Sequence, residues 1–175
     1  MMTETQAALR DIPDLAEHLL GLAPEGPLGA LRRQRADILK HEEGAYRELV
    51  LAPEPGHVSL AERAALALRG ALIEGDAALA AHYRALLATH GDAALSEAAE
   101  IFPAPAGEGR LPVLFRYADM VARNPEACEQ ADIDRLRGFG LSAQDIVAVT
   151  QLVAFIPYQV RLLAGLRQLQ QENAA

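Results

Sequence analysis

The stretch Ser59–Tyr83, SLAERAALALRGALIEGDAALAAHY, decides the fold. Ser59 followed by Glu62 matches a capping box, in which the serine oxygen accepts from a first-turn N–H and the glutamate reaches back to the cap. Gly75 suits the left-handed end of one helix, and Asp76 suits the N-cap of the next. The stretch therefore predicts two helices joined by a tight turn. Apolar residues at helical spacing mark the buried side of the first helix: Leu60, Ala64, Leu68 and Leu72.

The rest of the chain also shows helical patterns between loops that contain proline and glycine. Residues 1–26 form a leader, and residues 27–175 form a single helical domain with an internal loop at 103–112. Pro157 inside the last helix removes a backbone hydrogen bond and predicts a kink. We expect an all-α bundle of about eight helices with no strand. The helices expected outside Ser59–Tyr83 are 14–22, 27–51, 92–101, 111–123, 131–139 and 142–171, with Leu28, Leu31, Ile38, Tyr46 and Leu49 on one face of 27–51.

Composition and charge argue against a nucleic-acid-binding protein. The 175 residues carry 16 basic and 24 acidic side chains, a formal net charge of −8, and 5% are aromatic with no tryptophan. A duplex-binding surface needs a basic stripe, and a single-strand platform needs aromatic rings. The nearest candidate stripe is Arg32-Arg33-Gln34-Arg35, which we interpret as the solvated face of a helix that also carries acidic residues.

The sequence also argues against a disulfide, a membrane span and a metal site. Cys128 is the single cysteine. The N-terminal residues lack the basic start and continuous apolar core of a secretory signal. The longest uncharged apolar run, Ile146–Val160, is shorter than the ~18 residues that a membrane span needs. Runs such as Glu17-His18 and His41-Glu42-Glu43 place neighbours on different helix faces, so we expect solvated polar residues there. We therefore expect a cytoplasmic protein that binds no metal, cofactor, nucleic acid or membrane.

Two patterns resemble a known family. The hairpin, with His82 in its second helix, is similar to the active-site hairpin of the carboxymuconolactone decarboxylase/alkylhydroperoxidase-D (AhpD) family, where a Glu on the first helix precedes NGC-x-x-C-x-x-x-H. The C-terminal pattern from Asp132 to Val147, DIDRLRGFGLSAQDIV, and the opening LAPEGPLGALR at Leu22–Arg32 resemble a subgroup known as CMD domain proteins. The resemblance spans roughly residues 20–169.

The resemblance implies an AhpD-like helical bundle that assembles into dimers, trimers or hexamers. Typical members reduce peroxides with two cysteines and a Glu/His relay, and another branch decarboxylates a muconolactone without the cysteine pair. When the hairpin is aligned through His82, the two cysteine positions fall on Gly75 and Ala78. Peroxide reduction of this kind needs a thiolate and a resolving thiol. Cys128 lies far along the chain among acidic residues, which work against a reactive thiolate, so we interpret it as an incidental thiol.

The resemblance makes His82 the first candidate for chemistry, with Glu62 as its partner. Histidine suits proton transfer near neutral pH. The alternatives are a His82 that only bonds a neighbour in the core or an interface, and a Glu62 that serves only as a helix cap. Asp76, beside the lost cysteine position, can orient a water or bind a cation with His82, or it can be an ordinary N-cap. Glu74 reaches the same cleft if the hairpin register shifts by one residue.

Four further residues are candidates for binding. Gly75 leaves space over the former cysteine position. Tyr83 follows His82 and points to a different face, where its phenol can bind or merely pack. Tyr158 and Arg161 flank the expected kink, and we expect Arg161 to form a buried salt bridge, with a substrate clamp as the alternative.

Two functions from different classes remain open. The first is a non-peroxidase binding or assembly subunit, related to antioxidant-defence proteins, that holds a small apolar molecule, forms a homo-oligomer or pairs with a cysteine-bearing relative. The second is an acid–base enzyme of the decarboxylase or lactone type that uses His82 and Glu62. Residual peroxidase-related activity through Cys128 is the remaining alternative.

Overall fold

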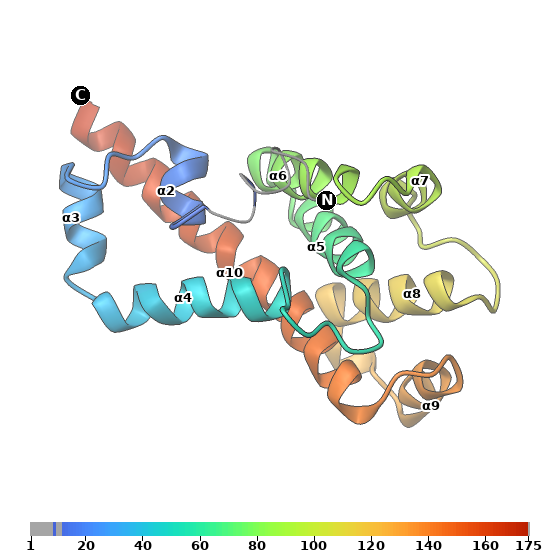
Figure 1. Ribbon diagram of the computed structural model, residues 1–175. Helices are drawn as coiled ribbons and strands as arrows, with labels where there is room; N and C mark the ends of the chain where they lie inside the picture. Colours follow the sequence, from blue (N-terminus) through green and yellow to red (C-terminus); the bar gives the residue numbers. More distant parts are fainter. Residues whose placement is uncertain (1–8, 10–11, 175) are drawn as a thin grey trace.

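The computed structural model describes Leu9 and residues 12–174. All regular secondary structure in this part of the chain is helical (Figure 1). The expectation of an all-α fold with about eight helices is confirmed, with nine α-helices among the described residues. Their bounds are α2 (Leu15–Leu20), α3 (Pro27–Arg33), α4 (Ala36–Leu49), α5 (Leu60–Glu74), α6 (Ala77–Ala88), α7 (Ala93–Glu100), α8 (Arg110–Arg123), α9 (Gln130–Gly138) and α10 (Ala143–Ala174), with a short 3-10 turn at Pro125–Ala127.

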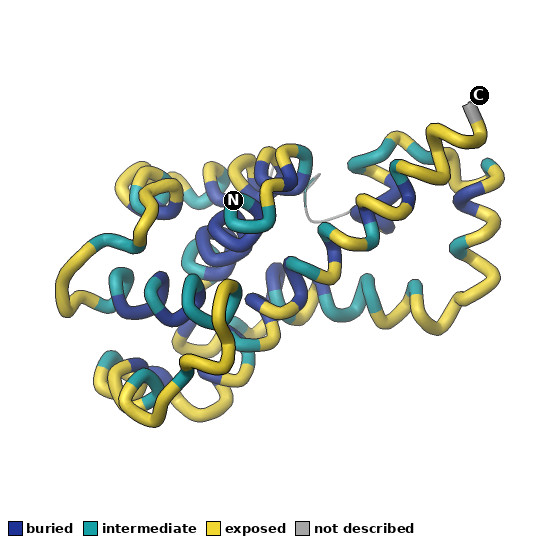
Figure 2. The backbone as a smooth tube through the Cα atoms, turned by 180° about the vertical axis from the view of Figure 1, so that it is seen from behind, coloured by how far each residue is buried: buried dark blue, intermediate teal, exposed yellow. Residues whose placement is uncertain are grey.

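Helix α5 is the centre of the bundle. It packs against α6, α7, α8 and α10, and every residue from Arg63 to Ala71 is buried. Figure 2 shows this helix dark blue over most of its length, whereas α4 and the C-terminal end of α10 are largely exposed. Full burial of a leucine is worth about 1.5–3 kcal/mol, so Leu66 and Leu68 anchor this core.

The hairpin between α5 and α6 forms as its sequence predicts. Ser59 and Glu62 make both hydrogen bonds of the capping box. Gly75 adopts φ 77° and closes α5, and the carboxylate of Asp76 accepts from the N–H of Leu79 to cap α6. A left-handed φ is unfavourable for residues with a Cβ, which explains the glycine at this turn.

A glycine also sets how closely α10 crosses α5. A Cβ on Gly70 would lie 3.1–3.2 Å from three side-chain atoms of Ile156. The backbone of α5 therefore approaches α10 more closely than an alanine allows without movement of Ile156.

Helix α10 runs for 32 residues and continues through Pro157 as one helix. By length and composition its segment Ala143–Asn173, with mean hydropathy 1.6, is apolar enough to cross a membrane, and 44% of that window is buried within this chain. The core helix of a water-soluble bundle passes the same test, so this is weak evidence for a membrane span. Val147, Tyr158 and Leu169 are among its exposed apolar side chains.

The single long helix expected over 27–51 is wrong. The chain leaves helical geometry at Arg35, where φ is −117° and ψ is 56°, so α3 and α4 are separate helices. The break separates the apolar residues that were expected on one face. Leu28 and Tyr46 are buried, but Leu31 and Ile38 are among the exposed apolar residues.

Candidate functional site

His82 lies in the buried interior with a tyrosine as its partner. Its side chain projects from α6, the residue is 5% exposed, and its Nε2 lies 2.8 Å from the hydroxyl of Tyr46 on α4. Burial, helped by the charge of His18, lowers the pKa of His82 to about 4. His82 is therefore a neutral imidazole near pH 7.

Tyr46 keeps its proton under the same conditions, because burial raises the pKa of its phenol. Either partner can donate in the Tyr46–His82 hydrogen bond, depending on which ring nitrogen of His82 carries the proton. The contact is a hydrogen bond between two neutral groups. It is poorly suited to hold a charge, since neither group ionises readily in this setting.

Two more buried groups extend this arrangement. Tyr83 is fully buried, its ring packs edge-on against His82 with centroids 5.2 Å apart, and its hydroxyl donates to Oε1 of Gln159 at 2.5 Å. Gln159 comes from α10 and is 4% exposed. We call Tyr46, His82, Tyr83 and Gln159 the polar cluster. It joins α4, α6 and α10, three helices far apart in the sequence.

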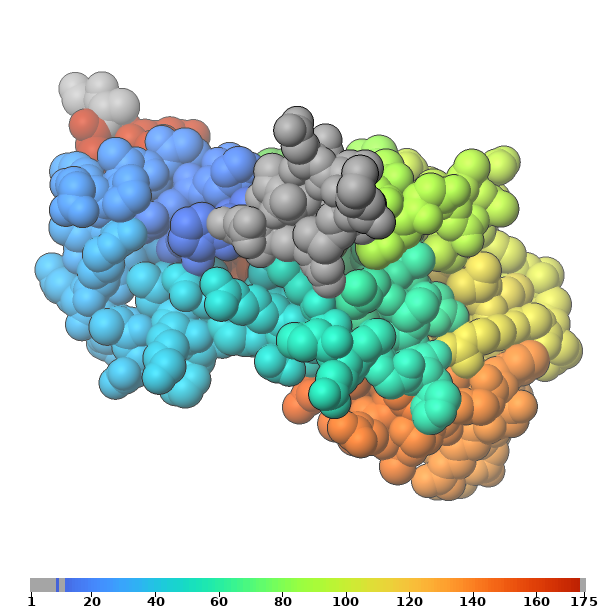
Figure 3. Space-filling view, viewed as in Figure 1, coloured from blue at the N-terminus to red at the C-terminus, as the bar shows by residue number. Residues whose placement is uncertain are grey.

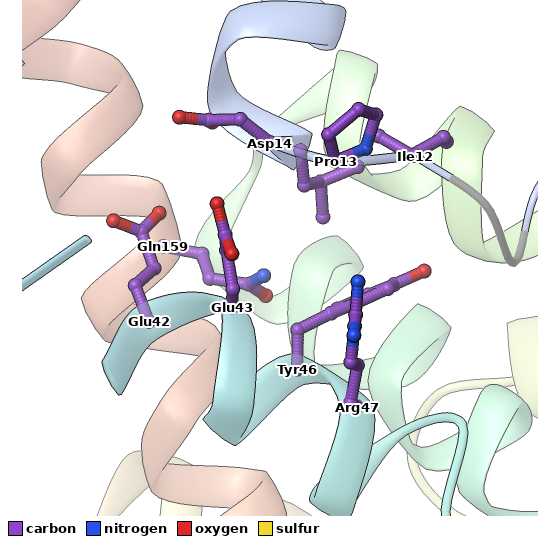
Figure 4. A pocket seen from close by; sticks show the side chains of 9 residues that line it. Ile12, Pro13, Asp14, Glu42, Glu43, Tyr46, Arg47 and Gln159 are labelled. Atoms are coloured by element: carbon purple, nitrogen blue, oxygen red, sulfur yellow. The ribbon is translucent and has the colours of Figure 1, made fainter. Parts of the chain in front are cut away.

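A small cavity opens beside the polar cluster (Figure 4). About 20 Å³ of it is open to water, which is room for about one molecule. In Figure 4, Tyr46 and Gln159 line one side and the segment at Asp14 covers the other. The full lining is Ile12, Pro13, Asp14, Leu15, Glu42, Glu43, Tyr46, Arg47 and Gln159.

The leader helix α2 covers this cavity and is tied to α3 by ion pairs. Arg32 donates to Asp14 at 2.8 Å and to Glu42 at 3.2 Å, and Arg33 donates to Glu17 at 2.8 Å. Arg32, Asp14 and Glu42 are each mostly buried at the side chain. The prediction of a solvated basic face is therefore wrong for Arg32, because α2 folds back over it; Glu17 and Glu42 are likewise paired rather than freely solvated.

The structure does not bring Glu62 to His82. The Glu62 carboxylate accepts from Ser59 and from Arg110, which donates at 2.7 Å. No hydrogen bond or ion pair between Glu62 and His82 exists in the described part of the chain. Glu62 is 13 residues before Gly75 and His82 is seven after it. In an antiparallel hairpin this offset leaves Glu62 roughly 9 Å farther from the turn, at 1.5 Å per residue.

Gly75 and Ala78, the positions expected to match the family's two cysteines, lie at the turn, and an ion pair joins Asp76 between them to α10. Gly75 is exposed, Ala78 is half-buried, and Asp76 between them is 6% exposed. Arg167 from α10 contacts both carboxylate oxygens of Asp76, at 2.5 and 3.1 Å. Burial alone would raise the pKa of Asp76, but the bonds from Arg167 and from the α6 N–H groups outweigh it and lower that pKa. Asp76 is thus an N-cap held by a cation, and its carboxylate is not directed to His82.

Tyr158 and Arg161 lie on the exposed side of α10. Tyr158 stacks on Phe155, with ring centroids 5.8 Å apart, and makes a long hydrogen bond of 3.4 Å to Glu42. The buried salt bridge expected for Arg161 is not present, because Arg161 is exposed and makes no ion pair within the described residues. The buried arginines are Arg63 and Arg69 instead.

Cys128 lies in another part of the bundle, near α8. It follows the turn Pro125–Ala127, lies partly buried against the core, and is close enough to Tyr117 on α8 to influence the pKa of that phenol. Neither residue belongs to the polar cluster.

Sequence reasoning missed Tyr46, Gln159 and Arg167 as parts of the site. Tyr46 was visible as a polar-tipped aromatic on an apolar helix face, and Gln159 as an uncharged polar residue inside the most apolar segment. Buried tyrosine and glutamine side chains need hydrogen-bond partners, which is the signal that both residues offered. Arg167 gave no such signal.

Comparisons with known proteins support the architecture. No family model and no curated protein matches the sequence. The solved structures that resemble the chain include two crystal structures. An uncharacterized peroxidase-related protein from Silicibacter sp. TM1040 is 23% identical with TM-score 0.62, over 74% of this chain and 68% of that one. An uncharacterized peroxidase-related protein with an alkylhydroperoxidase AhpD core, from Ralstonia eutropha JMP134, is 18% identical with TM-score 0.61, over 75% and 70%. This chain therefore has an AhpD-like fold, as the hairpin and the C-terminal pattern predicted.

Proposed function

We propose that this AhpD-like chain is a non-peroxidase protein that acts as a small-molecule-binding or assembly subunit. The observation that carries the proposal is the state of the hairpin. The two cysteine positions hold Gly75 and Ala78, and Asp76 between them is held by Arg167. His82, the residue that would activate a thiol, is bound by Tyr46. Thiol peroxidase chemistry has neither its nucleophile nor a free base at this place.

The surface of α10 supports the assembly part of the proposal. Val147, Tyr158 and Leu169 are exposed apolar side chains of this helix, and their spacing of 11 residues places them on one face. An apolar helix face left open to solvent suits a protein interface. A second copy of the chain is the simplest partner, and a cysteine-bearing relative of the same fold is the alternative.

Two measurements on the purified protein test the proposal. We expect no consumption of hydrogen peroxide or cumene hydroperoxide with dithiothreitol as reductant, and no difference between the wild type and Cys128→Ser. We expect light scattering to show an oligomer that Val147→Glu weakens, with Glu97→Gln on the exposed side of α7 as a control. Peroxide turnover above the buffer rate would overturn the non-peroxidase assignment, and a monomer at all concentrations would overturn the homo-oligomer.

Acid–base catalysis is a second candidate, supported by one specific observation. The 2.8 Å contact between His82 and Tyr46 beside a water-sized cavity is a proton-relay geometry. In this candidate function Tyr46, rather than Glu62, is the hydrogen-bonding partner of His82. A hydrolysis or decarboxylation activity found by substrate screening should disappear in His82→Gln and survive in Glu62→Gln.

A further inference from the structure

Gln159 has a donor group that the protein does not use. The residue is 4% exposed and its Oε1 accepts from Tyr83, but its Nε2 has no hydrogen-bond partner among the described residues. No fully enclosed side-chain polar atom in the described part of the chain lacks a partner, and the Gln159 side chain borders open space in the adjacent cavity. An acceptor placed there can take a hydrogen bond from the Gln159 amide, worth about 0.5–1.5 kcal/mol net.

That open space consists of two small cavities that share a wall. The first is the water-sized cavity beside Tyr46, and the second offers about 10 Å³ among apolar side chains. Leu15, Glu42 and Gln159 line both. The rest of the second lining is Ala16, Leu19, Leu79, Leu162 and Leu163. Side chains of α2 therefore lie in the walls of both cavities, and moving α2 would enlarge both.

Helix α2 packs on α10 and buries Leu15 and Ala16, but it is not among the helices that pack extensively against α5. Its polar side is held by the Asp14–Arg32 and Glu17–Arg33 pairs and by a hydrogen bond from Gln170 to the carbonyl of Leu20. The Glu17–Arg33 pair is the more exposed of the two ion pairs, because the Arg33 side chain is 41% exposed. Figure 1 shows α2 beside α10, and Figure 3 shows it at the surface of the molecule. Movement of α2 therefore leaves the α5-centred core in place.

We propose that an uncharged small molecule with an apolar body and one hydrogen-bond acceptor binds where Leu15 and Leu19 now lie, with Gln159 Nε2 donating to the acceptor and α2 serving as a displaceable cover. This inference rests on the proposed binding function. The apolar body replaces the contacts of α2 with Leu162 and Leu163.

The charges around the cavity select against an anion. The carboxylates of Asp14, Glu42 and Glu43 outnumber the guanidinium groups of Arg32 and Arg47. Burial raises the pKa of Glu42, with the nearby Asp14 adding to this, so the site already resists negative charge.

Benzamide, benzoate and toluene test the inference, because they share a shape and differ in the polar group. Binding to the full chain is measured by titration calorimetry at pH 7. We expect benzamide to bind about fivefold more tightly than toluene or benzoate, the ratio that one net hydrogen bond supplies. In Gln159→Met this preference should vanish. Tyr83→Phe is the matched control, because it breaks the same Tyr83–Gln159 bond and keeps the amide nitrogen.

The role of α2 as a displaceable cover is tested by a variant that should bind benzamide more tightly. Arg33→Gln breaks the Glu17 pair and touches no cavity wall, so opening costs less and benzamide should bind about threefold more tightly. Arg84→Gln, which breaks an exposed pair on α6, should leave binding unchanged. Hydrogen exchange of residues 12–20 should rise when benzamide binds, whereas α5 stays protected.

Each outcome counts for or against the site. The proposed site is wrong if Arg33→Gln does not bind benzamide up to the solubility limit of benzamide. It is also wrong if the three compounds bind equally well, or if Gln159→Met keeps the preference for benzamide. Unchanged exchange in residues 12–20 with benzamide bound would overturn the cover. Peroxide turnover by the purified protein would overturn the proposed function and would leave these binding results as they stand.

Discussion

Nε2 of His82 lies 2.8 Å from the hydroxyl of Tyr46, although 36 residues separate them in the sequence. The contact joins α6 to α4 inside the bundle and holds the imidazole in a dry environment. Because a charged imidazole is costly to bury, the fold favours its neutral form.

The stability of the protein should depend on pH through His82. The folded-state pKa of about 4 lies below the unfolded value of 6.5. The unfolded chain therefore binds the proton first, and stability is fully present above about pH 6.5 and is lost as the pH falls toward 4. The loss amounts to about 3 kcal/mol at the low end. Urea unfolding at pH 7 and pH 5 measures it, and His82→Gln should flatten this dependence. An equal pH dependence in that variant would contradict the assignment.

Placing cysteines at positions 75 and 78 should not create a peroxidase. Gly75→Cys places a Cβ at φ 77°, which costs about 1–2 kcal/mol. His82 stays bound to Tyr46, so no free base faces the new thiols. We expect the Gly75→Cys/Ala78→Cys double variant to be less stable than Ala78→Cys alone and to consume no peroxide. Turnover above that of the wild type would show that the hairpin keeps the chemistry of the family in a latent form.

Arg69 should be among the costliest side chains to remove. It is 0% exposed, makes two short bonds to Asp119 at 2.5 and 2.7 Å, and donates to carbonyl oxygens that include that of Ile101. Arg69→Met leaves the Asp119 carboxylate without its partner and should lower the free energy of unfolding by about 3–5 kcal/mol. Arg84→Gln breaks an exposed pair and should cost less than about 1 kcal/mol in the same assay.

Two glycine-to-alanine variants should separate the contribution of core packing to stability from that of helix propensity. Gly70→Ala forces a Cβ against Ile156 and should destabilise the protein by about 1 kcal/mol or more, in spite of the gain in helix propensity. Gly44 also lies within a helix, but nothing surrounds its position within 4 Å. Gly44→Ala should therefore stabilise the protein by about 0.5–1 kcal/mol. Chemical unfolding of both variants gives the comparison, and a stabilised Gly70→Ala would mean that α10 shifts freely on α5.

Much of the fold could be predicted because its determinants are local. The caps at Ser59, Gly75 and Asp76 depend on bonds within one turn of the chain, and all three form as expected. The long-helix prediction over 27–51 fails at Arg35, where the backbone leaves helical geometry, and none of the local patterns in the sequence marks that break.

The candidate site was less predictable than the helices. His82 was identified from its place in the hairpin, and its role in chemistry stays a prediction. Its expected partner Glu62 lies farther from the turn than His82 does and bonds Arg110 instead. Its observed partner Tyr46 comes from α4, and sequence spacing does not predict how α4 packs on α6. Arg161 was expected in the interior and lies outside, because its position on α10 faces away from the bundle.

The sequence by itself determined most of the helices, the caps at Ser59, Gly75 and Asp76, and the absence of sulfur at positions 75 and 78, because each of these depends on residue identity and on contacts within a few positions. The tertiary structure alone decided that His82 meets Tyr46, that Gln159 keeps an unused donor and that α2 covers both. Those relations depend on the angles and axial offsets at which helices cross, and packing across the whole chain sets these quantities.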